Sequence, residues 1–124
     1  MEMKQIEQDM PIVVEAIKSK QLQILEIKNQ QLEAEMLLDF EKSKLSREIS
    51  EALDEKGKKK FNNAEVREVE LNLRISGNEG IKSMVVDLKK VETDVQKEEI
   101  ELHYLENKFK MMRYLVRLFS AEQN

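Results

Sequence analysis

The sequence has no cysteine and no tryptophan, and only one proline and three glycines among its 124 residues. Without cysteine there is neither a disulfide framework nor thiolate chemistry, which is typical of a protein in a reducing compartment. So few prolines and glycines argue against a β-sandwich or β-barrel, because those folds need turn residues at short intervals. What remains is 37% charged and 40% hydrophobic, a composition that favours long amphipathic helices.

Long hydrophobic runs are also missing. No apolar segment approaches the ~20 residues that a membrane-spanning helix needs. The first ten residues, MEMKQIEQDM, carry acids where a signal peptide would carry cations and an apolar core. We therefore expect a cytoplasmic protein with no membrane partner. The net charge of -4 is mild, so the chain as a whole is neither a general nucleic-acid binder nor a strongly acidic mimic.

The last third of the chain carries the clearest pattern. Apolar residues recur there in unbroken steps of three and four with one polar interruption, at Ile81, Met84, Leu88, Val91, Val95, Glu98, Leu102, Leu105, Phe109, Met112, Val116 and Phe119. This spacing predicts a coiled-coil helix over residues 79–120 whose seam packs against another helix. A face committed to such packing leaves no room for a substrate cleft.

A second long helix is predicted over residues 11–56, opening at Pro11 with Asp9 as its cap. Its seam is less regular and runs through Val13, Ile17, Ile24, Ile27, Ala34, Leu38, Leu45, Ile49 and Ala52 or Leu53. Lys20, Gln31 and Glu41 are polar breaks in it. Further apolar residues lie off this seam, at Leu22, Leu25, Leu32, Met36, Leu37 and Phe40. One partner helix cannot cover both surfaces.

The connector, residues 57–80, is predicted to be a basic loop followed by a short helix. Gly57 is placed to end the first helix in a left-handed cap, and Asn62 with Glu65 has the spacing of a capping box. Gly77 and Gly80 are expected to end the short helix. Apolar and polar residues alternate from Val69 to Ile75, so a strand is the alternative over residues 66–76.

Together these elements predict an all-α fold in one domain over residues 1–124. The two long helices have matched lengths and a compact connector, so they should fold back as a long antiparallel helical hairpin, a coiled coil with a short connecting helix. The apolar surface left over on the first helix predicts a homodimer that forms a helical bundle.

The segment Phe109–Phe119, FKMMRYLVRLF, is apolar nearly all round the helix. Such a stripe is most often bundle core or dimer interface. It is also suited to docking another protein, because methionine adapts to irregular surfaces and arginine is enriched at interfaces. The predicted partner-binding residues are Phe109, Met112, Arg113, Tyr114 and Arg117. Peripheral membrane attachment is a weaker interpretation, since the cations are few.

A second candidate site is the basic loop. Its lysines could contact phosphates, with Phe61, Asn62 and Asn63 beside them; they are Lys56, Lys58, Lys59 and Lys60. A charge-rich, solubilising turn is the commoner outcome for such a cluster.

No pattern points to catalysis, a cofactor, a metal or a small-molecule substrate. His103 is the only histidine and Glu99 precedes it by one turn, a spacing that does not match a di-metal carboxylate bundle. No phosphate-binding loop or nucleophile elbow is present. Glu98, in the middle of the seam, would need a cation such as Lys28 or Lys42 across the interface, and could then specify the helix register.

One resemblance adds to these patterns. The run from Asn62 through Glu68 and the acidic heptads that end in Glu101, Leu102, His103, Tyr104, Leu105 and Phe109 resemble small helical proteins of phages and prophages of Gram-positive bacteria. The resemblance covers about the second half of the chain and implies an accessory role near recombination and replication, in the host cytoplasm. In general shape the chain is also similar to coiled-coil phage inhibitors of host nucleases.

The sequence therefore predicts a non-catalytic phage-type accessory or inhibitory protein. It would act by binding a host or phage protein complex, such as nuclease, defence or recombination machinery. The alternatives are a nucleic-acid-binding accessory protein of recombination or replication, and a structural coiled-coil subunit.

Overall fold

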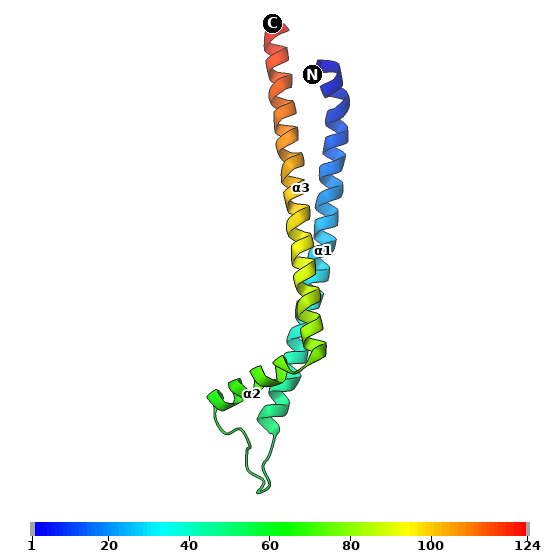
Figure 1. Cartoon of the computed structure of the whole chain (residues 1–124). Helices are drawn as coiled ribbons and strands as arrows, with labels where there is room; N and C mark the ends of the chain where they lie inside the picture. Colours follow the sequence, from blue (N-terminus) through cyan, green and yellow to red (C-terminus); the bar gives the residue numbers. More distant parts are fainter. Residues whose placement is uncertain (1, 124) are drawn as a thin grey trace. The chain divides into compact units, whose positions relative to one another are not determined.

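The protein is all-α, as the computed structural model shows for residues 2–123 (Figure 1). Helix α1 spans Met3–Glu51, α2 spans Ala64–Ser76 and α3 spans Glu79–Gln123. Within these described residues there is no strand, and Leu53 and Lys59 form an isolated bridge. The predicted architecture of two long helices and a short connecting helix, consistent with a helical hairpin, is confirmed.

The chain packs into two compact units, and α1 and α3 contribute a segment to each. The first unit joins Met1–Asn29 with Glu92–Asn124, and the second is Gln30–Val91. In the first unit the two helices lie antiparallel, with a core of Ile6, Val13 and Met112. In the second unit the buried apolar residues are Leu38, Ile49 and Ile81. The single domain over residues 1–124 stays a prediction.

The predicted seams are confirmed residue by residue, and we call them the inner seams of α1 and α3. All twelve predicted seam positions of α3 are buried or half-buried. The same is true of the predicted positions on α1, where the seam ends at Ala52, because Leu53 is 59% exposed. The heptad period alone thus identified the buried face of both long helices.

The start of α1 differs from the prediction. The helix begins at Met3, so Pro11 lies inside it instead of opening it. An internal proline lacks the N–H that would bond to the carbonyl of Glu7, at a cost of ~3 kcal/mol. The extra turns bury Ile6 completely and place Met10 against the same cluster. Burial of these apolar side chains offsets the missing hydrogen bond.

The end of α1 also differs, because a local turn competes with the helix. The helix stops at Glu51 and not near Lys56. The Asp54 carboxylate accepts hydrogen bonds from the backbone N–H groups of Lys56 and Lys58, both at 2.9 Å. Gly57 has φ of 77°, the left-handed conformation predicted for it, but it serves this turn and does not cap the helix.

Helix α2 resolves the choice between helix and strand over residues 66–76. Its alternating apolar residues divide between two faces: Leu71 and Ile75 are half-buried, whereas Val69 and Leu73 are 57% and 62% exposed. Apolar side chains on both faces of a short helix imitate the alternation of a strand.

The caps of α2 and α3 correct two further expectations. The N-cap of α2 is Asn63, whose side chain accepts a hydrogen bond from the N–H of Val66 at 2.8 Å, so the expected Asn62 is one residue too early. Gly77 ends α2 with a right-handed φ of -91°. Gly80 does not end it, since it lies in the first turn of α3 behind the cap that Asn78 forms to Ile81.

The early start of α1 gives a testable prediction. Ile6→Ala should lower the free energy of unfolding by about 2–5 kcal/mol, since it opens a cavity in the core cluster. Pro11→Ala should raise it by up to about 3 kcal/mol, because the alanine N–H completes the helix. Thermal unfolding followed by circular dichroism measures both. If the helix began at Pro11, both substitutions would be close to neutral.

Candidate partner-binding face

The structure divides the predicted partner-binding residues between the core and the surface. Met112 is only 2% exposed and belongs to the core cluster of the first unit. Phe109 packs against that cluster. Met112 helps to hold α1 and α3 together and is not free to contact a partner, whereas Phe109 is half-buried and also lines an open groove. Arg113, Tyr114 and Arg117 are exposed.

The exposed residues gather on one side of α3, with Lys110 beside them. Lys110, Arg113, Tyr114 and Arg117 line a shallow depression of about 170 Å³. We call these four residues the basic face. Next to it runs an open groove of about 380 Å³, to which α1 contributes Val14 and Ile17. The Arg113 guanidinium lies over the Phe109 ring at 6.0 Å, so the core aromatic orients it.

None of the three cations of the basic face has a carboxylate within 4.0 Å among residues 2–123. Glu106, one turn before Lys110, lines the neighbouring groove with Lys110 and Arg113. Farther along α3, Lys20 pairs with Glu98 and Glu101, and Lys28 pairs with Glu99 at 3.0 Å. The basic face therefore carries three unpaired positive charges beside an exposed aromatic ring. Arginine in such a setting presents its planar fork of donors to an incoming carboxylate or phosphate.

The second candidate site is the basic loop, where the backbone N–H groups of Lys56 and Lys58 donate hydrogen bonds to Asp54. The Lys59 ammonium donates a hydrogen bond to the carbonyl of Ser50 at 2.7 Å, near the end of α1. This contact places a cation at the negative end of the helix dipole. The Lys60 ammonium lies over the Phe61 ring at 5.6 Å. Lys56 and Lys58 are exposed, and their side chains reach no carboxylate in the part of the chain that the structure describes.

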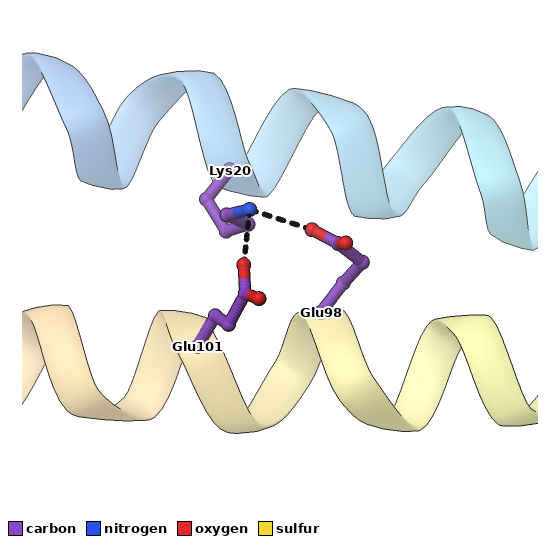
Figure 2. A network of polar contacts seen from close by, with 3 residues as sticks. All are labelled: Lys20, Glu98 and Glu101. Carbon is purple, nitrogen blue, oxygen red and sulfur yellow. Dashed lines mark hydrogen bonds and ion pairs between the residues drawn. The ribbon is translucent and has the colours of Figure 1, made fainter.

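The polar interruption of the α3 seam has a definite partner (Figure 2). The Lys20 ammonium lies 2.6 Å from a carboxylate oxygen of Glu98 and 2.7 Å from one of Glu101. The expected partners of Glu98, Lys28 and Lys42, are thus replaced by Lys20, the first polar break of the α1 seam. The hydrogen bonds with Glu101 and then Glu98 raise the pKa of Lys20 above its ordinary value of 10.5, against a smaller opposing effect of burial.

His103 and Glu99 line an open groove of about 520 Å³ with Gln96 and Ile100. Over the described residues, no group of three or more His, Asp or Glu side chains is placed to hold a metal ion. Within the same residues, no helix combines the length and the apolar character needed to cross a bilayer.

The sequence analysis missed that the predicted Tyr114 belongs to a longer row of exposed apolar residues. Along the side of α3 away from its inner seam, five large apolar side chains are exposed: Ile100, Tyr104, Met111, Tyr114 and Leu118. Their spacing in steps of three and four could have identified them. The inner seam runs through the same segment, however, and its more regular pattern was enough to explain why the segment is apolar. The off-seam apolar residues of α1 are exposed as predicted, at 52–63% for Leu22, Leu25, Leu32, Met36, Leu37 and Phe40.

No protein-family model, curated protein or solved structure matches the chain. The functional argument therefore depends on the geometry of its own residues.

The Lys20 network gives a prediction about pH. A lysine whose pKa is raised by folding stabilises the fold at pH values below its unfolded pKa, and this contribution is lost as pH rises through the folded pKa. Lys20→Met should therefore lower the melting temperature at neutral pH, and the difference from the native chain should shrink above pH 10.5. Thermal melts across this range measure it. Lys18→Met, at an exposed position, is the matched control, and a difference that persists undiminished at high pH would contradict the role of the network.

Proposed function

We propose that this chain is a non-catalytic, protein-binding factor whose basic face binds an acidic surface of another protein. The observation that carries the proposal is that Lys110, Arg113 and Arg117 share one side of α3 and that none of them has a carboxylate within 4.0 Å among residues 2–123, although Glu106 lines the adjoining groove. Elsewhere in the same unit, three acids are paired across the helices. The basic face therefore groups three cations on one side of α3 that no ion pair within 4.0 Å neutralises among residues 2–123.

The geometry of the basic face suits a folded protein surface. Lys110, Arg113 and Arg117 are three and four residues apart, so they share one side of α3 and span about 10 Å along it. The helix below them is held rigidly by the core cluster of Ile6, Val13 and Met112. Rigid presentation lowers the entropy lost on binding, and Tyr114 adds aromatic contact area between the cations.

The biological role in this proposal is the one implied by the resemblance: a phage-type accessory or inhibitory protein. Its partner would be a host or phage complex of nuclease, defence or recombination machinery. Such a role requires a stable binding surface and no reaction chemistry. The two-helix packing of the first unit supports it, because the inner seams occupy one side of each helix and leave the other sides available for binding.

Nucleic-acid binding is the second candidate function. The observation that favours it is the turn at Asp54, which holds the backbone of Lys56 and Lys58 together while both side chains remain exposed. Two cations fixed in one turn could contact neighbouring phosphates. The sites of the two candidates share no residue, so mutations separate them.

Affinity capture from a lysate of the bacterium that carries the gene tests both candidates. Three tagged proteins are compared: the native chain, Arg113→Glu/Arg117→Glu, and the matched control Lys56→Glu/Lys58→Glu. Each capture is run with and without nuclease. We expect a discrete protein to survive nuclease and to be retained by the control, but to fall at least about tenfold with the Arg113→Glu/Arg117→Glu variant, because two contacts to an acidic surface become repulsive.

The opposite pattern would replace the proposal by the alternative. Material that disappears with nuclease, and that is retained by Arg113→Glu/Arg117→Glu but lost with Lys56→Glu/Lys58→Glu, would assign nucleic-acid binding to the basic loop. Circular dichroism of the three proteins checks that the helices are intact, as expected for substitutions at exposed positions.

A further inference from the structure

The inference concerns the exposed apolar residues of α3 in the first unit, together with the asparagine between them. Ile100, Tyr104, Asn107, Met111, Tyr114 and Leu118 follow one another in steps of four and three. This is a heptad pattern of alternating d and a positions with Asn107 at a d position. We call these six residues the outer seam.

The outer seam faces away from α1. Each of its members lies two residues after a member of the inner seam: Ile100 after Glu98, Tyr104 after Leu102, and so on to Leu118 after Val116. Two residues correspond to a rotation of about 200° around a helix, which is nearly the opposite side. The exposures agree, since Ile100, Tyr104 and Met111 are 70%, 65% and 64% exposed.

The area of the outer seam is large for a free surface. A large apolar or aromatic side chain contributes on the order of 200 Å², and five of them more than half exposed on average leave roughly 600 Å². Apolar patches of this size on monomers are usually functional. A standard protein interface covers about 800 Å² on each partner, so the seam with its polar flanks is sufficient for a stable helix pair.

The charges along α3 indicate what covers the outer seam. The helix is net acidic before residue 106 and net basic from it onward: Glu92, Asp94, Glu98, Glu99 and Glu101 against Lys97 on one side, and Lys108, Lys110, Arg113 and Arg117 against Glu106 and Glu122 on the other. A second α3 in the antiparallel direction brings the acidic half of each copy beside the basic half of the other. A parallel copy would bring all the cations together and would be repelled.

We propose that the outer seam binds the outer seam of a second copy of this chain in the antiparallel direction, about a two-fold axis between Tyr104 and Asn107. In an antiparallel coiled coil, a positions face d positions. Tyr104 then lies opposite Asn107 of the second copy, Ile100 lies opposite Met111, and Tyr114 and Leu118 lie opposite Lys97 and Thr93, which continue the same side of α3. The same register puts Glu101 of one copy beside Lys108 of the other, twice per dimer.

Asn107 fits this register. A single polar residue inside an apolar seam lowers stability but restricts the pairing to the alignment that satisfies it. Sliding the two helices by one heptad would place Asn107 opposite Met111 or Lys97 and would separate Glu101 from Lys108. The two-fold relation is also self-consistent, because every contact made by one copy is repeated by the other.

This inference goes beyond the proposed function and does not depend on it. Arg113 lies on the side of α3 between the two seams, so the self-association leaves it available to another protein. Tyr114 borders both surfaces. A failure of either proposal leaves the other intact, because their tests change different residues.

The first experiment measures mass by sedimentation equilibrium. We expect twice the 14.6 kDa of one chain for the native protein, and a single-chain mass for Tyr104→Glu/Met111→Glu with unchanged helicity. Val69→Glu/Leu73→Glu, which places the same charges on equally exposed apolar residues of α2, is the matched control and should remain dimeric. A native chain that is monomeric up to its solubility limit, or an assembly that survives Tyr104→Glu/Met111→Glu, would overturn the proposal.

The second experiment measures orientation and uses the absence of native cysteine. Chains with Ile100→Cys alone or Met111→Cys alone should form little disulfide, because antiparallel copies hold the two equivalent positions about 16 Å apart along the axis. A mixture of the two chains, one bearing a size tag, should give the mixed disulfide. Efficient cross-linking of either chain alone would show parallel pairing and would overturn the antiparallel register.

Discussion

The packing of the inner seams of α1 and α3 in the first unit is the constraint on which the other features depend. In this unit each seam is mostly apolar and has one charged member, Lys20 on α1 and Glu98 on α3, and the two meet; Lys20 also contacts Glu101 beside the seam. Sliding one helix by a heptad would place Lys20 opposite the apolar Val91 or Leu105. Burying a charge without its partner costs several kcal/mol, so the ion pairs select one register where the apolar residues alone would accept several.

Two helices that pack only against each other leave much of their surface exposed. Each helix is covered along one side only, and most seam residues are half-buried and not fully buried. Small cores of this kind stabilise a chain weakly, and an additional covered face adds stability in proportion to the apolar area removed from water. The exposed apolar residues of α1 and α3 therefore keep an unfavourable contact with water, which another helix would remove by covering them.

The parts of the fold that the sequence predicted are those governed by a long repeated pattern. Twelve successive positions on α3 constrain the buried face so strongly that no local feature could shift it. The parts that differed depend on competition at single residues. Pro11 is a good first residue of a helix, but the burial of Ile6 and Met10 outweighs that preference. Asp54 ends α1 early because its carboxylate binds two backbone N–H groups that the helix would otherwise have used.

The candidate site shows the same distinction. The segment Phe109–Phe119 was identified as interaction surface from its composition, which does not say which side of the helix each residue occupies. Phe109 and Met112 belong to the inner seam, and the structure accordingly places Met112 in the core cluster and Phe109 against it. Arg113 and Arg117 lie outside the inner seam, and packing against α1 does not use them. Unpaired positive charges on a helix surface lower the stability of the fold little, because water solvates them. They pair more strongly with the carboxylates of a partner whose surface excludes water from the contact. The proposed basic face therefore consists of residues that the inner seam does not use.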